Sequence, residues 1–180
     1  MNINLTETQN DYAIFLPALS GFYATYVGKQ RFEEYVPTDR IPSNLPHGVE
    51  SLNYLNKSQG KFQYKWTLYS AGHADLDITK EAPKEDMVRN RDRDNTWVLG
   101  DSGGFQIGKG VWAGDWKDPN CPKAHKKRDG VLKWMDEYMD YGMILDIPAW
   151  VSRSKAGQDA TGITTYQEAV DATRINNDYW

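Results

Sequence analysis

The sequence has little of what marks several common protein classes. It has one cysteine, Cys121, in 180 residues, which excludes an internal disulfide and a multi-cysteine zinc site within this chain and suits a reducing compartment. The histidines are not spaced as a metal-binding set: His47, His73 and His125. No apolar run approaches the roughly 20 residues that cross a membrane, and residues 1–11 lack the apolar core of a signal peptide. We therefore expect a cytoplasmic protein with no membrane partner.

An excess of positive charge is also missing. The formal net charge is −4, which argues mildly against a dedicated nucleic-acid binder. Two local basic runs stand against that average, one between Lys123 and Lys133 and one between Arg89 and Arg93. Solvated helix faces are the favoured interpretation of both runs, and contacts with phosphate are the alternative.

The composition otherwise fits one globular domain. Charged residues make up 26% and hydrophobic residues 39% of the chain, and 180 residues can bury one core. Aromatic residues are frequent, at 13%, but they do not cluster along the sequence. A structural role is therefore favoured for them, with stacking on bases as the alternative.

The most informative segment is residues 99–107, Leu-Gly-Asp-Ser-Gly-Gly-Phe-Gln-Ile. An apolar run ends abruptly at Asp101, which supplies an acceptor or a proton-transfer group. Gly103 and Gly104 let backbone N–H groups approach a ligand, because neither carries a Cβ. Phe105 offers a flat face, and Gln106 can donate and accept hydrogen bonds. The simpler alternative is a tight turn in which Asp101 caps a helix and Phe105 lies in the core.

Strands are expected to alternate with helices, which predicts βα units and a parallel α/β sheet. The expected strands cover residues 13–19, 64–70, 97–99 and 143–145. The expected helices cover residues 49–56, 83–92, 122–141 and 164–176, with Gly142 ending the third and Thr164 or Thr165 capping the fourth, where Glu168 completes a capping box. Residues 36–48 hold three prolines and are expected to be irregular.

Candidate functional residues follow each expected strand. They are Ser20, the loop from Ser70 to Asp75, the motif from Asp101 to Gln106, and Asp146. The active sites of (β/α)₈ barrels lie at the carboxyl ends of the strands, so this placement agrees with such a barrel. For Asp146 alone, capping of the next loop would be the simpler interpretation. A loop hydrogen-bonding role is favoured for His73 over a role in the pocket.

The string Asp101-Ser102-Gly103-Gly104-Phe105-Gln106 resembles the signature of the tRNA-guanine transglycosylases, which are TIM-barrel enzymes. Its flanks are more similar to the DNA 7-deazaguanine transglycosylases of phages and bacteria. A second match, residues 143–148, is a strand ending in Asp146. The resemblance covers roughly residues 12–150. It implies a pentosyltransferase that exchanges guanine in DNA for a 7-deazaguanine, in queuosine-like modification chemistry.

The resemblance also implies residue roles. Asp101 would be the catalytic proton-transfer group, with Ser102, Gly103 and Gly104 beside the base. Phe105 would stack on the heterocycle, Gln106 would position neighbouring groups, and Asp146 would read the purine edge. The family's nucleophilic aspartate and its zinc cysteines have no match here, so no cofactor is expected in this chain, and zinc only in a missing carboxyl-terminal half.

A complete (β/α)₈ barrel takes about 250 residues, and only about four strands are expected in these 180. We therefore expect the amino-terminal half of a TIM-barrel transglycosylase domain, truncated and inactive on its own. A natural half barrel, completed by a homodimer or by a second half-barrel chain, is the alternative. The alternative functions are a tRNA-guanine transglycosylase, a non-catalytic nucleic-acid-binding partner subunit, and an unrelated barrel hydrolase that uses Asp101 and Asp146 as a carboxylate pair.

Overall fold

A computed structural model describes residues 13–32 and 36–180 and shows a mixed α/β fold with a parallel sheet. The expectation for residues 1–11 lies outside the described residues. Strands β1 (Trp66–Ser70), β2 (Trp97–Asp101) and β3 (Tyr141–Gly142) lie in sequential order, all parallel. A parallel bridge from Ala18 to Leu68 adds the start of a fourth strand outside β1. The fold is therefore α/β, as the alternation predicts.

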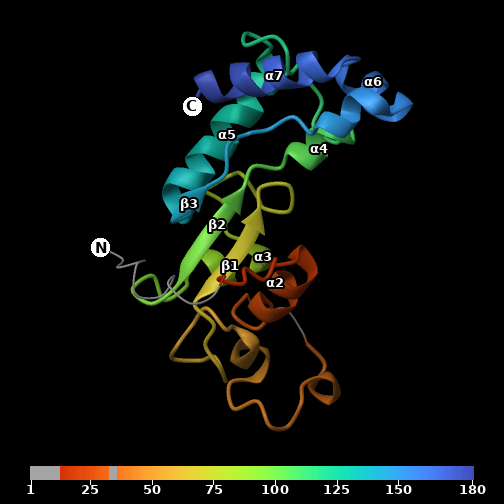
Figure 1. Cartoon of the computed structure of the whole chain (residues 1–180). Coiled ribbons are helices and arrows are strands. Elements are labelled where there is room, and N and C mark those ends of the chain that lie inside the picture. The colour runs from red at the N-terminus through yellow and green to blue at the C-terminus, as the bar shows by residue number, and fades with distance from the viewer. Residues whose placement is uncertain (1–12, 33–35) are drawn as a thin grey trace.

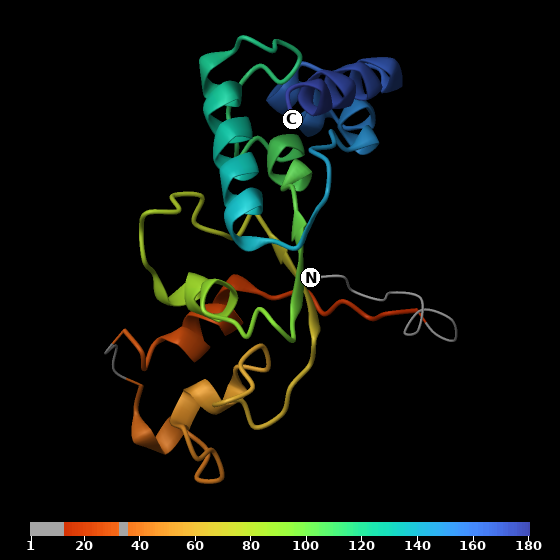
Figure 2. The ribbon, with the colours of Figure 1, turned by 90° about the vertical axis from the view of Figure 1, so that its left-hand side faces the viewer.

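Helices connect these strands and extend beyond them (Figure 1). The α-helices are α2 (Gly21–Gly28), α3 (Pro83–Arg89), α4 (Gly104–Gly108), α5 (Pro122–Tyr138), α6 (Lys155–Thr161) and α7 (Tyr166–Asp178). Short 3₁₀ helices are η1 (Thr38–Arg40), η2 (Gly48–Leu52) and η3 (Ala149–Arg153). In both views α4, α6 and α7 gather beyond the carboxyl ends of β1 and β2 (Figure 1, Figure 2).

One face of the sheet packs against helices. Figure 2 shows α2, α3 and α5 on the same side of the strands. Thr67, Tyr69 and Val98 point to that side and are fully buried, and the Tyr69 ring lies 5.8 Å from the Trp134 ring of α5. A Cβ on Gly100 would lie 2.7 Å from Met139, so glycine lets the end of α5 close against β2. This face supplies much of the hydrophobic core.

The opposite face is less covered. Trp66, Leu68, Trp97 and Leu99 alternate with the buried residues and remain partly exposed. The Trp66 ring lies 4.9 Å from that of Trp97 and 6.3 Å from that of Tyr141, so aromatic side chains far apart in the sequence form one row across three strands. The sheet therefore presents a half-buried apolar surface.

Several predicted elements are confirmed. Strand β1, helix α3 and helix α5 fall within the expected ranges, and α7 has the expected capping box between Thr165 and Glu168. The three hydrogen bonds that Thr164 and Thr165 donate to the Glu168 carboxylate lower its pKa to about 2. Helices α2, α4 and α6 are not among the expected elements.

Other predicted boundaries are wrong. Helix α5 ends at Tyr138 and not at Tyr141, because Asp140 already bonds to β2: its N–H donates to Val98 O at 3.0 Å, and its carboxylate accepts from Val98 N at 2.6 Å. The third strand is therefore Tyr141–Gly142 and not residues 143–145. In place of the α-helix expected over residues 49–56, only the 3₁₀ helix η2 (Gly48–Leu52) forms, and residues 13–19 make only the isolated bridge from Ala18 to Leu68.

The part of the chain that the structure describes contains no helix long and apolar enough to cross a membrane.

Candidate active site

The register of β1 and β2 places Ser70 directly beside Asp101 at the carboxyl end of the sheet. The Ser70 hydroxyl donates to Asp101 Oδ2 at 2.5 Å. The backbone N–H of Gly72 donates to Ser70 Oγ at 3.2 Å. Because Gly72 occupies a lone pair of the hydroxyl, the Ser70 proton is directed at the carboxylate. Asp101 is thus held by a neighbouring strand.

The two glycines after Asp101 make a turn that only glycine accommodates easily. Gly103 has φ +82°, in the left-handed region, and is the N-cap of α4 without a side-chain cap. A Cβ at Gly103 would also lie 2.5 Å from the Trp112 ring. Asp101 therefore does not cap α4, and Phe105 is 57% exposed. In both respects the simpler interpretation of the motif is wrong.

Beside Asp101 is a cavity of about 370 Å³. It is lined by residues of the segment before α2, of β1 and β2 with the loop after β1, and of α4. These residues are Ala18, Leu19, Ser20, Leu68, Ser70, His73, Asp101, Phe105 and Gln106. The Gln106 side-chain oxygen is buried and has no hydrogen-bond partner among the described residues. Gly72 allows the close approach of that amide, because a Cβ there would lie 2.1 Å from Gln106 Cδ. The cavity is therefore lined by a carboxylate, a flat ring and an amide.

Asp146 lies on the other side of the motif. A Cβ on Gly104 would meet Asp146 O at 2.3 Å and Asp146 Oδ1 at 3.0 Å, so the start of α4 is packed directly on this residue. Partial burial against α4 raises the pKa of the Asp146 carboxyl, and the negative charge of Asp101 raises it further; the nearby Ser102 hydroxyl offsets part of this. The rest of the side chain is open to solvent. Asp146 is not a wall of the cavity itself.

The segment that carries Asp146 is anchored from beyond the sheet. Ile147 N–H donates to Thr173 Oγ1 of α7 at 2.8 Å. The next element, η3, has Pro148 as its N-cap, so Asp146 does not cap it. The simpler interpretation of Asp146 as a capping residue is therefore wrong.

The structure brings most of the predicted site residues together. The cavity is lined by Asp101, Phe105, Gln106 and His73. The loop residues between Asp101 and Phe105, which are Ser102, Gly103 and Gly104, are buried. The sequence does not predict the hydrogen bond from Ser70 to Asp101, although both residues end expected strands. It also does not single out Trp112 and Trp150; the Trp150 ring lies 6.0 Å from that of Phe105. Their packing depends on turns that leave no periodic signal.

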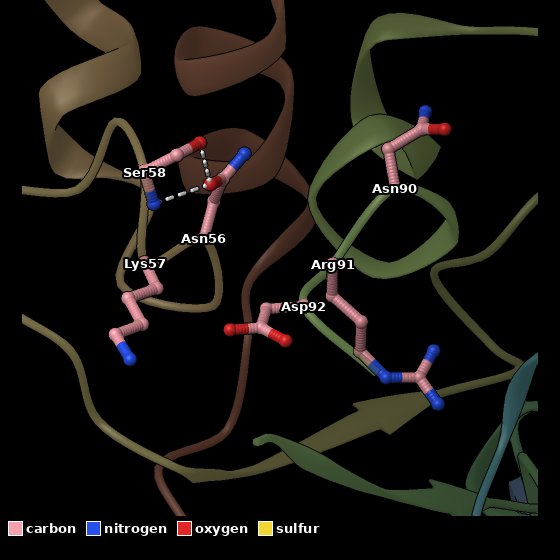
Figure 3. Close-up of a pocket in the computed structure, with 6 residues that line it drawn as sticks. All are labelled: Asn56, Lys57, Ser58, Asn90, Arg91 and Asp92. Carbon is pink, nitrogen blue, oxygen red and sulfur yellow. Dashed lines mark hydrogen bonds between the residues drawn. The ribbon is translucent and has the colours of Figure 1, made fainter. Parts of the chain in front are cut away.

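A second cavity, of about 530 Å³, lies at the opposite end of the sheet, before β1 and β2 (Figure 3). Two of its three charged residues, Arg91 and Asp92, are used by the fold. Arg91 Nη2 donates to Asp140 Oδ2 at 3.0 Å, and the Asp92 carboxylate accepts from Asn95 at 3.0 and 3.1 Å. Figure 3 shows the Arg91 side chain directed away from Asn56 and Lys57. We therefore place the candidate site at the carboxyl end.

The basic runs are in part the solvated faces favoured from the sequence, since Lys123, Lys126 and Lys133 are exposed, but Arg91 and Arg128 are buried. Arg128 is fully buried, where its guanidinium donates to Asn176 Oδ1 at 2.6 Å and to backbone carbonyls of residues 116–119. Arg91 is also buried, and Arg89 lies 4.7 Å from the centre of the Tyr138 ring. These arginines support the fold and leave the lysines of α5 as the accessible cations.

Within residues 13–32 and 36–180, no group of three or more His, Cys, Asp or Glu side chains is placed to hold a metal ion. The described residues therefore offer no site for the zinc ion that the resemblance implies for another part of such an enzyme.

No protein-family model, no curated protein and no solved structure significantly matches this chain.

Proposed function

We propose that the protein is a transglycosylase that exchanges guanine in DNA for a 7-deazaguanine base through a glycosyl-enzyme intermediate. The observation that carries the proposal is the convergence of Asp101 and Asp146 on the loop that presents Phe105 and Gln106. Two carboxyl groups, a flat ring and an amide are the groups that recognition and protonation of a purine require.

The position of each residue determines its role in recognising the base. Asp146 is open to solvent on one side, so its carboxylate can accept from the coplanar N1–H and N2–H₂ donors of a guanine-like base. Phe105 covers one face of the heterocycle, and the unpartnered Gln106 oxygen accepts from a ring or exocyclic N–H. The base has to leave its stack to reach these groups.

Asp101 moves the proton. As the bond from C1′ to the departing guanine breaks and a carboxylate oxygen bonds to C1′, Asp101 gives its proton to the leaving nitrogen. When the incoming base attacks C1′ and displaces the carboxylate, Asp101 takes the proton from its nitrogen. Ser70 holds Asp101 through both transfers. We assign the nucleophilic carboxylate to no residue of this chain.

The finer fold we propose is a (β/α)₈ barrel, of which these strands form about half. Its support is the sheet: strands in sequential order, all parallel, with helices on one face and an apolar opposite face left half-buried. Parallel sheets are normally covered on both faces. In a barrel, the row of Trp66, Trp97 and Tyr141 would point to the interior.

The test is incorporation of a radiolabelled 7-deazaguanine into duplex DNA by the barrel completed with the part that carries the nucleophile, with tRNA as the alternative acceptor. We expect label in DNA, and none with Asp101→Asn. Asp159→Asn removes a carboxylate that is paired with Lys155 on the surface of α6, and it should incorporate label normally. No label in either polymer, together with no binding of the free base, would refute the proposal.

The runner-up function is a non-catalytic subunit that binds nucleic acid. It is favoured by the missing match for the family's nucleophile, and it predicts binding of base and polymer without exchange.

A further inference from the structure

Two lysines flank the motif loop, and each ammonium group lies over an aromatic ring. Lys109 Nζ, just after α4, is 5.5 Å from the centre of the Phe105 ring and 5.4 Å from that of Trp150. Lys127 Nζ, on α5, is 4.9 Å from the centre of the Trp112 ring. Trp112 in turn packs against Gly103. The two cations therefore lie beside the same loop, Lys109 at the end of α4 and Lys127 on α5.

Neither ammonium group has an anionic partner. Among the described residues, Lys109 and Lys127 form no ion pair, in contrast to Lys133 with Asp129 and Lys155 with Asp159. The charge of Asp75 favours the protonated form of Lys127, but the Asp75 carboxylate already forms an ion pair with Lys80 Nζ at 3.5 Å. Partial burial and the neighbouring Lys126 lower the pKa of Lys127, so an anion beside it would stabilise its charged form.

The rings hold these lysines in place. A cation over an aromatic face gains about 0.5–1 kcal/mol at an exposed site, so part of the entropy cost of ordering the side chain is met before a ligand arrives. The paired surface lysines, by contrast, already have their charge compensated. A net charge of −4 for the whole chain is thus compatible with two lysines beside the motif loop that form no ion pair among the described residues.

We propose that Lys109 and Lys127 bind backbone phosphates of a polynucleotide on either side of the base held at Asp101. The inference rests on the proposed function for the identity of that base, but the phosphate contacts themselves need no chemistry at the site. Backbone contacts of this kind fix the register of the strand and carry no sequence information.

The experiment measures binding of a fluorescent duplex oligonucleotide and of tRNA at several salt concentrations. Lys109→Gln and Lys127→Gln keep most of the side-chain stem over the ring and remove only the charge. Each variant should reduce the slope of log K against log salt by about 0.9, which corresponds to an affinity loss of roughly eightfold at 0.1 M salt. The double variant should reduce this slope by about twice as much as either single variant does. Lys57→Gln, at the opposite end of the sheet, is the matched control and should bind as the wild type does.

An unchanged salt slope in the double variant, with either polymer, would overturn the inference. The inference is also overturned if Lys57→Gln weakens binding as much as the two loop variants do. Base exchange with an unchanged slope would remove the phosphate contacts and leave the proposed function standing. Lysine-dependent binding of the polymer by a protein that does not bind the free base would support the contacts and refute the proposed function.

Discussion

Ser70 and Asp101 occupy matching positions at the ends of adjacent parallel strands, and the Ser70 hydroxyl donates to Asp101 Oδ2 at 2.5 Å. Since Gly72 N–H fixes the hydroxyl from the other side, the carboxylate has one preferred orientation. The second Asp101 oxygen is left for a ligand. The orientation of the Asp101 carboxylate is therefore set by the neighbouring strand β1.

Ser70→Ala should lower the rate of base exchange about tenfold or more, because a hydrogen bond to a charged group is worth about 1.5–3 kcal/mol. The effect should fall on kcat more than on KM for the base, since Ser70 orients the proton-transfer group. Ser70→Thr keeps the hydroxyl and should restore much of the rate. A Ser70→Ala variant with the wild-type rate would show that Asp101 needs no such support.

Asp101→Asn should abolish base exchange and leave the fold intact. The amide has nearly the same shape and can still accept from Ser70, but it cannot take or give the proton. Circular dichroism and thermal unfolding would check the fold, and incorporation of labelled base would check the chemistry. Incorporation at the wild-type level would remove Asp101 from the mechanism.

Much of this site can be predicted from the sequence because its residues follow strand ends. Asp101 ends β2, and parallel strands bring such positions to one edge. Asp146 lies beyond the end of β3, so the expected strand end does not explain its place against Gly104 of α4. The α7 boundary is also predictable, since its capping box is purely local. For Asp101 and for α7, the signal lies within a few residues of the feature.

What cannot be predicted depends on contacts between distant segments. The third strand moves to Tyr141–Gly142 because Asp140 bonds to Val98, which lies 42 residues away. Arg128 is buried because Asn176 and three backbone carbonyls receive its guanidinium. Nothing in the basic run from Lys123 to Lys133 distinguishes that one arginine from its exposed neighbours.

Asp146→Ala should weaken binding of a free 7-deazaguanine by at least tenfold, through the loss of charge-assisted hydrogen bonds worth about 1.5–3 kcal/mol. Calorimetry on the free base measures this directly. Asp129→Ala removes a carboxylate paired with Lys133 on the outer surface of α5 and is the control. Equal affinities for wild type and Asp146→Ala would reject the assignment.

The same carboxyl predicts how base binding depends on pH. Its pKa is raised in the free protein, so Asp146 holds its proton to a higher pH than an ordinary aspartate does. The base needs the carboxylate, so affinity should rise as pH rises toward the raised pKa of the free protein and level off above it, with release of a proton on binding below that pKa. In the protein alone, Asp146 binds more protons when folded than when unfolded, so its contribution to stability falls as pH rises from the ordinary aspartate pKa of 3.8 through the raised value. Asp146→Asn should flatten the pH dependence of affinity, and an unchanged profile would assign it to another group.

Gly104→Ala should impair both stability and base binding. The added Cβ would lie 2.3 Å from the Asp146 carbonyl, so α4 and the Asp146 segment must separate. Gly130→Ala is the matched control: it adds the same methyl group on α5 in ordinary contact with Leu76 at 3.6 Å, and it should stabilise by up to about 1 kcal/mol through helix propensity. Thermal unfolding of both variants compares them. A Gly104→Ala protein as stable as the wild type would show that the two segments are not tightly packed.

A covalent adduct should not form when residues 1–180 alone are incubated with DNA and a 7-deazaguanine. The reason is the division of roles: Asp101 is oriented by Ser70 for proton transfer, and Asp146 lies against Gly104, where it can read a base. Neither is assigned the attack on C1′. Denaturing electrophoresis of the reaction would reveal a trapped glycosyl-enzyme as a shifted band. If an adduct appears and Asp101→Asn removes it, Asp101 is the nucleophile, and the proton must be carried by Asp146, whose raised pKa would then suit it for that role.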